Sequence, residues 1–257
     1  MILNAVRMGE GPPIMLLHGL FGAASNWGRV QRRLAETHNV VALDLRNHGS
    51  SPHGPAMTYP LMAEDVVETL DAQGLAAVGL LGHSMGGKVA MHVALAHPER
   101  VFRLLVADIA PVPSPPTFRP IAAALRALPL APGLTRAAAG TALEATVEDP
   151  AVRAFLLQNL RFGDPPAWRI GLDEIAAALP EIESWSGAGR YDGPTLVLRG
   201  EHSPYVKPEH RPLFRALFPA CRFASLRGAG HWLHADAPEP FVEIVRTFFD
   251  RPATPAA

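Results

Sequence analysis

Residues 80–87 read LLGHSMGG and place Ser84 between Gly82 and Gly86. An apolar run, 78–81, precedes this G-x-S-x-G pattern, and a segment compatible with a helix follows it. On a sharp strand-to-helix turn, the central serine is forced into a strained conformation that exposes its hydroxyl. Glycine is needed on both sides because a β-carbon there would crowd the turn. The pattern therefore predicts a nucleophilic Ser84 rather than an ordinary glycine-rich turn.

The rest of the chain alternates short apolar runs with helical patterns, which is typical of a mostly parallel sheet. We therefore predict an α/β fold class, with a mostly parallel sheet flanked by helices. The end of the chain, 252–257, has the composition of a frayed tail. The predicted strands are 14–17, 40–43, 78–81, 104–107, 195–198 and 222–226, with an edge strand at 2–6.

The alternation stops between residues 111 and 191, where proline-rich breaks separate Ala- and Leu-rich helical pieces and no strand is predicted. A helical insertion at the carboxyl edge of a sheet would cover the ligand crevice. We therefore expect a core of residues 1–110 and 192–257 and a helical cap, or lid, of residues 111–191. A decoration without a gating role is the alternative. Candidates for an apolar pocket wall in the cap are Phe118, Leu125, Leu128, Phe155 and Phe162.

The composition of the chain limits the classes of binding partner and the cellular compartment that we expect. The net charge is −1 at pH 7, and no basic block suggests nucleic acid or an anionic membrane. No apolar run reaches membrane-spanning length, and the first residues are too mixed for a signal peptide. Cys221 is the only cysteine, so an intrachain disulfide is impossible and a cytoplasmic location is expected. The expected partner is a small molecule, and the oligomeric state is left open.

A serine hydroxyl is a weak nucleophile that needs a base within hydrogen-bond reach and a third group to orient that base. His231, in the segment GAGHW at 228–232, follows the last predicted strand, so its loop could carry it over Ser84. His234 is the second candidate and fits better as a hydrogen-bonding or solvent-facing neighbour. His83 is a poor base because adjacent side chains at a sharp turn point apart.

A third signal is the segment HGLFG at 18–22, directly after the predicted strand 14–17. Acyl transfer requires stabilisation of a developing oxyanion, and backbone amides are its usual donors. On a sheet of this kind, one donor follows the nucleophile and one comes from the loop after an early strand. These positions predict an oxyanion hole formed by the backbone N–H groups of Leu20 and Met85.

Four segments together resemble the YbfF-like esterase group of the α/β-hydrolase superfamily, and the similarity extends over nearly the whole chain. They are 44–53, 82–91, 108–111 and 228–236. The resemblance implies hydrolysis of short and medium acyl esters, with acyl thioesters accepted by some members, and no cofactor.

The acid is the position where the chain departs from the commoner superfamily pattern. Many relatives carry an aspartate shortly after the strand equivalent to 195–198, where this chain has Ser203. The YbfF-like group shares this departure and places its acid after the preceding strand, which implies Asp108 here. Glu201 is the main rival and Asp173, in the insertion, a weaker one. Asp108 as a mere turn residue is the structural alternative, and Ser203 is expected to hydrogen-bond the acid or the base.

The predicted function is a serine hydrolase with the triad Ser84, Asp108 and His231, acting on carboxylic esters or acyl thioesters through an acyl-enzyme. A perhydrolase, a carbon–carbon bond hydrolase and a non-catalytic ligand-binding protein are the alternatives. Asp44 ends a strand where a dinucleotide-binding fold would hold a ribose, but no G-x-G-x-x-G follows the first strand. Neither a cofactor nor a metal is therefore expected, and Lys88 is assigned no chemistry.

Overall fold

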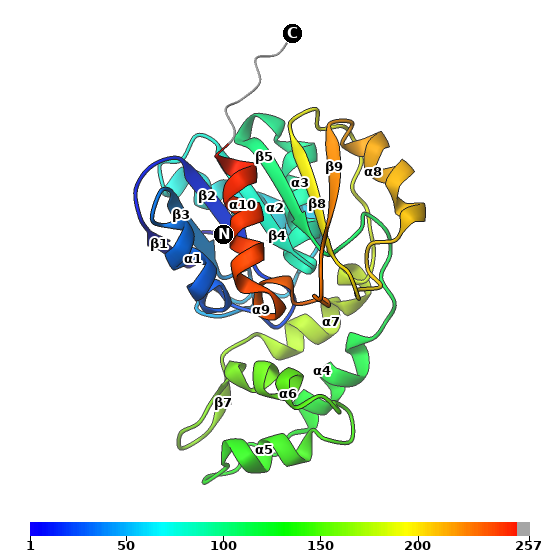
Figure 1. The fold of residues 1–257 in the computed structure, drawn as a ribbon. Helices are drawn as coiled ribbons and strands as arrows, with labels where there is room; N and C mark the ends of the chain where they lie inside the picture. Colours follow the sequence, from blue (N-terminus) through cyan, green and yellow to red (C-terminus); the bar gives the residue numbers. More distant parts are fainter. Residues whose placement is uncertain (251–257) are drawn as a thin grey trace.

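The computed structural model describes residues 1–250, so the tail predicted for 252–257 lies outside the described residues. Seven strands form one sheet in the order β1-β3-β2-β4-β5-β8-β9, and all neighbours are parallel except β1 with β3 (Figure 1). The strands are β1 (Ala5–Met8), β2 (Pro13–Leu17), β3 (Asn39–Leu43), β4 (Val78–His83), β5 (Val101–Ala107), β8 (Thr195–Gly200) and β9 (Cys221–Leu226).

The predicted α/β class is confirmed, and the six predicted parallel strands coincide with β2, β3, β4, β5, β8 and β9. The edge strand predicted at 2–6 is wrong in its bounds, because β1 pairs with β3 only from Ala5 onward. Leu3 instead enters the core, and its N–H donates to Thr69 Oγ1 at 2.9 Å.

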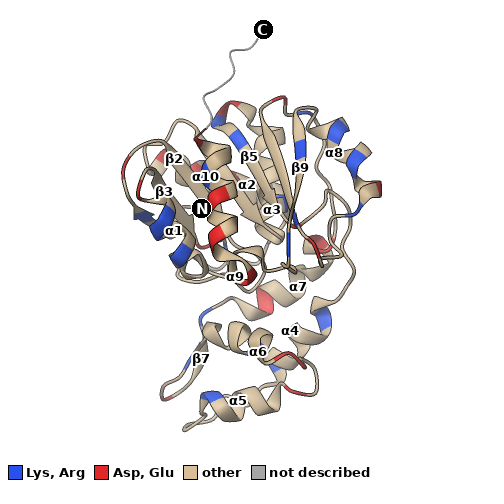
Figure 2. Ribbon diagram, viewed as in Figure 1, with Lys and Arg blue, Asp and Glu red and all other residues tan. Residues whose placement is uncertain are grey.

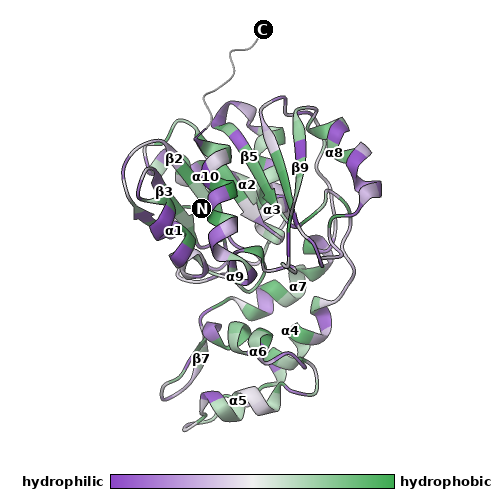
Figure 3. Cartoon of the chain, in the orientation of Figure 1, coloured by the Kyte–Doolittle hydropathy of each residue, from purple (hydrophilic) through white to green (hydrophobic). Residues whose placement is uncertain are grey.

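Helices cover both faces of the sheet because side chains alternate along each strand. Ile14 and Leu16 of β2 belong to one apolar cluster, and Met15 and Leu17 belong to the other. Figure 3 shows the resulting pattern, with apolar strands inside and more hydrophilic outer helix faces. The covering helices are α1 (Gly28–Leu34), α2 (Tyr59–Ala72), α3 (Met85–Ala96), α8 (Arg211–Leu217) and α10 (Pro238–Phe249), with the short α9 (Leu233–Asp236) and the 3-10 turns η1 (Ala24–Trp27), η2 (Pro98–Arg100) and η4 (Pro208–His210).

The chain between β5 and β8 forms a helical layer that extends away from the sheet (Figure 1). We call residues 111–191 the insertion. One feature differs from expectation: β6 and β7 pair antiparallel, although no strand is predicted there. Two-residue strands are too short to leave a periodic pattern in the sequence. The elements of the insertion are α4 (Phe118–Ala127), α5 (Arg136–Ala142), α6 (Pro150–Leu156), η3 (Leu157–Asn159), β6 (Leu160–Arg161), β7 (Ala167–Trp168) and α7 (Leu172–Ile182).

Charged residues of both signs are interspersed over the molecule (Figure 2). Arginines of α1 lie beside glutamates of α10, where Arg29 forms an ion pair with Glu239. Within residues 1–250, no helix combines the length and the apolar character needed to cross a bilayer.

Candidate active site

Ser84 lies at the sharp turn between β4 and α3. Its backbone has φ 52° and ψ −120°, a conformation that residues with a β-carbon rarely adopt. A β-carbon at Gly82 would clash with the backbone of Gly86, and one at Gly86 would clash with the carbonyl of His18. The two glycines therefore permit the close packing that holds the serine in its strained conformation.

The structure brings Ser84, His231 and Asp108 into one hydrogen-bonded chain. His231 Nδ1 lies 2.7 Å from Asp108 Oδ2, and His231 Nε2 lies 3.0 Å from Ser84 Oγ. A carboxylate can only accept, so Nδ1–H donates to Asp108 and leaves Nε2 free to accept from the serine hydroxyl. In this tautomer the imidazole can take the proton of the serine hydroxyl.

Asp108 directly follows β5 and is completely buried. The N–H of Gly200 donates to its Oδ1 at 2.9 Å, and the hydroxyl of Ser203 donates to its Oδ2. Ser203 is the residue that occupies the usual acid position, and it contacts the acid rather than the base. These bonds hold the carboxylate in place beside His231.

The rival acids lie elsewhere. Glu201 is about half exposed, and its carboxylate accepts the N–H of Gly228 at 2.8 Å. Asp173 is exposed on α7 and pairs with Arg126 at 2.6 Å. Among residues 1–250, Asp108 is the carboxylate that hydrogen-bonds His231.

The other two histidines near Ser84 take different positions. His83 Nε2–H donates to the backbone carbonyl of His231 at 2.8 Å, so it holds the loop that carries His231. The ring of His234 packs 4.7 Å from that of Trp27, and among the described residues its Nδ1 has no hydrogen-bond partner. His234 also lines the cavity beside Ser84, so its hydrogen-bonding or solvent-facing role stays a prediction. Burial lowers its pKa to about 4.

The two predicted oxyanion donors flank Ser84. Met85 is the first residue of α3, so its N–H has no acceptor within the helix. Leu20 lies in the loop after β2, and both residues line a cavity that also reaches Ser84. Both residues therefore lie close to the serine, and the oxyanion hole formed by their N–H groups stays a prediction.

Two buried histidines hold the Leu20 loop. His18 Nε2 accepts the N–H of Leu45 at 2.9 Å, and His48 Nε2 accepts the N–H of Phe21 at 3.1 Å. A ring nitrogen can accept only when it carries no proton, so both rings must be neutral. Burial lowers the pKa of His18 and lowers that of His48 to about 3, which keeps them neutral.

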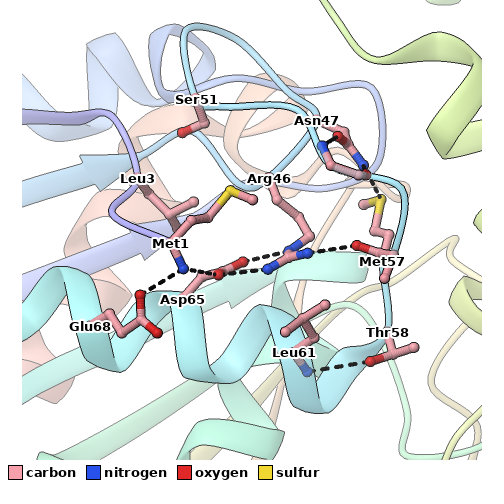
Figure 4. Close-up of polar contacts among 12 residues, drawn as sticks. Met1, Leu3, Arg46, Asn47, Ser51, Met57, Thr58, Leu61, Asp65 and Glu68 are labelled. Carbon is pink, nitrogen blue, oxygen red and sulfur yellow. Dashed lines mark hydrogen bonds and ion pairs between the residues drawn. The ribbon is translucent and has the colours of Figure 1, made fainter.

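The loop that carries His48 is held by a buried ion pair (Figure 4). The Arg46 guanidinium donates to both carboxylate oxygens of Asp65, at 2.5 and 2.7 Å. The same carboxylate accepts from the ammonium of Met1 at 2.6 Å, and Arg46 also donates to the carbonyl of Ala56. These polar contacts hold the loop that follows β3 against α2.

A cavity of about 250 Å³ opens beside Ser84 and His231, between the sheet and the insertion. Its wall is mostly apolar. Of the five predicted wall residues, Phe118 and Phe155 line it, whereas Leu125, Leu128 and Phe162 do not. The insertion also contributes Ile121, Val152 and Leu156.

Two residues at the site were not predicted. The ring of Tyr205 stacks on His231 at 4.1 Å between centroids. Asn159 Nδ2 donates to the carbonyl of Phe21 at 2.7 Å and so ties the insertion to the Leu20 loop. Tyr205 follows Ser203 by two residues and could have been found from that loop, but Asn159 has no local signal in the sequence.

Comparison with known proteins agrees with this arrangement. Residues 12–238 match the alpha/beta hydrolase fold family. Esterase YbfF of Escherichia coli (strain K12) is 37% identical and covers 96% of both chains. The sn-1-specific diacylglycerol lipase ABHD11 of Mus musculus is 38% identical over 92% of this chain and 80% of its own length. A solved structure titled marine microorganism esterase has a TM-score of 0.93 and 37% identity, over 96% of this chain and 99% of that one. The chain therefore belongs to the α/β-hydrolase fold family and, within it, to the YbfF-like esterases.

Proposed function

We propose that this chain is a serine hydrolase that cleaves small-molecule carboxylic esters with the triad Ser84, His231 and Asp108. The observation that carries the proposal is the continuous hydrogen-bonded chain of these three side chains beside an apolar cavity. Relatives that match nearly the whole chain are named as an esterase and a diacylglycerol lipase, which supports ester hydrolysis.

The reaction follows from the geometry. Ser84 Oγ attacks the ester carbonyl while His231 Nε2 takes its proton, and Asp108 stabilises the imidazolium that forms. The carbonyl oxygen becomes an oxyanion that accepts hydrogen bonds from the N–H groups of Leu20 and Met85. His231 then gives the proton to the leaving alcohol. A water molecule, activated by the same histidine, attacks the acyl-enzyme and releases the acid.

Ser203 and Tyr205 act as positioning residues. The Ser203 hydroxyl donates to the same Asp108 oxygen that accepts from His231, so it restricts rotation of the carboxylate. The Tyr205 ring covers one face of His231. Both contacts favour the single ring orientation in which Nε2 faces Ser84.

Residues 111–191 act as a cap on a core of residues 1–110 and 192–257. The support is that the insertion supplies Phe118, Ile121, Val152, Phe155 and Leu156 to the cavity wall. An apolar wall of this size suits short and medium acyl chains. Acyl thioesters present the same carbonyl chemistry and are the second substrate class.

The test uses Ser84→Ala, assayed on a panel of p-nitrophenyl esters and acyl-CoA thioesters. We expect kcat to fall by roughly 10⁴-fold or more, because triad members act as a unit. The wild type should react with a fluorophosphonate probe and Ser84→Ala should not, while Ser186→Ala, an exposed serine of the insertion, keeps both properties. Turnover by a folded Ser84→Ala protein would refute the mechanism. A wild-type protein that neither reacts with the probe nor turns over esters would point to a ligand-binding member instead.

A further inference from the structure

A second cavity, of about 20 Å³, also reaches Ser84. It shares Leu20, Ser84, Phe118 and Tyr205 with the large cavity, but other residues form the rest of its wall. Both walls are mostly apolar, and the small one also includes the polar side chains of Lys88, Ser114 and Glu183. The proposed reaction uses none of these three side chains.

Lys88 supplies a hydrogen-bond donor to this space. It lies in the first turns of α3, four residues after Ser84, and is 1% exposed. Its ammonium donates to Ser114 Oγ at 3.1 Å and to the carbonyl of Ser184 at 2.8 Å. The ammonium also lies 5.5 Å from the centroid of the Tyr59 ring. Of its three donors, two have oxygen acceptors among residues 1–250, so one N–H is left to bind an oxygen. Burial lowers the pKa of Lys88 to about 8, so the ammonium form still dominates at neutral pH.

Glu183 supplies an acceptor from the insertion. Its Oε2 accepts from the Arg119 guanidinium at 2.5 and 2.8 Å. Its Oε1 is buried, and among residues 1–250 it has no hydrogen-bond partner. A buried carboxylate oxygen without a partner is destabilising, so it marks a place where another group can bind.

The size of the small cavity and its polar side chains together indicate which chemical group it can bind. About 20 Å³ is enough for one water-sized group and too little for a ring or a branched chain. A hydroxyl both donates and accepts, so it can satisfy Glu183 Oε1 and the spare N–H of Lys88 at once. A carboxylate has no proton to donate to Glu183 and would bring a second negative charge beside it.

The residues that line the two cavities also indicate whether the hydroxyl belongs to the acyl part or the alcohol part of the ester. The leaving oxygen must lie beside His231, which donates a proton to it. His231 lines the large cavity but not the small one, whereas Met85 lines the small one but not the large one. The small cavity therefore faces the acyl side of the carbonyl. Ser84 and the polar side chains line the same cavity of about 20 Å³, so the hydroxyl must lie only a few bonds from the carbonyl carbon.

We propose that the small cavity bordered by Lys88, Ser114 and Glu183 is a subsite for an acyl-chain hydroxyl, which makes short hydroxyacyl esters a preferred substrate class. This inference rests on the proposed ester hydrolysis at Ser84. The hydroxyl enters the small cavity while the rest of the substrate occupies the large one.

The test compares p-nitrophenyl 3-hydroxybutyrate, as each enantiomer, with p-nitrophenyl 3-methylbutyrate, in which a methyl replaces the hydroxyl. Rates are normalised to alkaline hydrolysis to remove differences in intrinsic reactivity. We expect kcat/KM for one enantiomer to exceed that for the methyl analogue by about tenfold or more, because the analogue leaves buried polar groups unpaired. The opposite enantiomer should show no such preference, because the cavity has a fixed position.

Lys88→Met should reduce this ratio by about tenfold, because it removes the donor and retains a similar shape. Lys207→Met, at the only other lysine of the chain and exposed, serves as the matched control and should keep the ratio. Glu183→Gln provides an independent variant if Lys88→Met does not fold, and it should also lower the ratio. A wild-type ratio near one, or a ratio that survives both variants, would overturn the subsite and leave only a water site. Failure of the wild type to hydrolyse any of the esters would instead refute the proposed function.

Discussion

Among residues 1–250, the non-glycine residues with positive φ are Phe21, Asn47, Ser84 and Asp108, with φ between 52° and 62°. Ser84 and Asp108 belong to the proposed triad, and Phe21 adjoins the proposed oxyanion donor Leu20. Such conformations cost of order 1–3 kcal/mol each and persist only where surrounding structure imposes them. Here the N–H of Phe21 donates to His48 and its carbonyl accepts from Asn159, so both peptide groups that flank Phe21 are held. The strain therefore coincides with the groups whose positions the reaction requires.

The assignment of the acid can be tested with a substitution that keeps its shape. Asp108→Asn should lower kcat by about 10³–10⁴-fold, because an amide can donate to Nδ1 and favour the wrong imidazole tautomer. Glu201→Gln is the control, since Glu201 contacts the backbone of Gly228 and not His231. Steady-state kinetics on p-nitrophenyl butyrate gives both values. A severe loss in Glu201→Gln together with a mild one in Asp108→Asn would reverse the assignment.

At the scale of elements, strands were predicted most accurately from the sequence where their apolar pattern agrees with their burial in the structure. The strands β4 and β5 are apolar throughout or nearly so, which parallel strands buried on both faces require, and they were found within two or three residues. The positions of Ser84 and Asp108 followed, because both residues come directly after such strands. The antiparallel edge strand β1 is half exposed, and its apolar and polar residues alternate less clearly. Its predicted bounds therefore differ from the observed ones. Asn159 was missed because its partner, Phe21, is 138 residues away and nothing nearby in sequence marks the contact.

The contribution of the insertion to substrate choice can be tested on α6. Phe155 lines the large cavity and lies 6.3 Å from the ring of Trp232. Phe155→Ala should enlarge the cavity and shift the kcat/KM profile toward longer acyl chains, with each methylene of contact worth about 1–3 kcal/mol. Phe162→Ala is a matched control, because Phe162 also lies in the insertion but outside the cavity wall, under the Arg136 guanidinium. Identical profiles for the two variants over esters of increasing chain length would show that the insertion has no part in selection.

Over the whole molecule, buried histidines link the site to the stability of the fold. Burial lowers the pKa of each below its ordinary value, to about 3 for His48 and to about 4 for His92 and His234. In the unfolded chain these rings take up protons near pH 6.5, whereas in the folded chain they stay neutral. Between these values the unfolded state binds more protons, so the free energy of unfolding falls as the pH falls. Acid should therefore destabilise the folded protein, in part through the histidines that hold the Leu20 loop. The histidines with lowered pKa are His18, His48, His83, His92 and His234.

The contribution of one buried histidine to this pH dependence can be measured at His92, because His92 lies on α3 away from the triad. Its ring stacks on Tyr59 and packs against Trp185, and among the described residues its Nε2 has no hydrogen-bond partner. Burial, and to a lesser degree the charge of Lys88, lower its pKa to about 4. Replacement by a ring that cannot titrate, His92→Phe, should make the loss of stability between pH 6.5 and 4 shallower, by at most about 1.4 kcal/mol per pH unit. Urea titrations at several pH values measure the two curves, and the difference at pH 8, where the wild-type ring is neutral in both states, gives the packing effect alone. Parallel curves from pH 8 to pH 4 would mean that His92 is protonated as readily in the folded protein as in the unfolded chain.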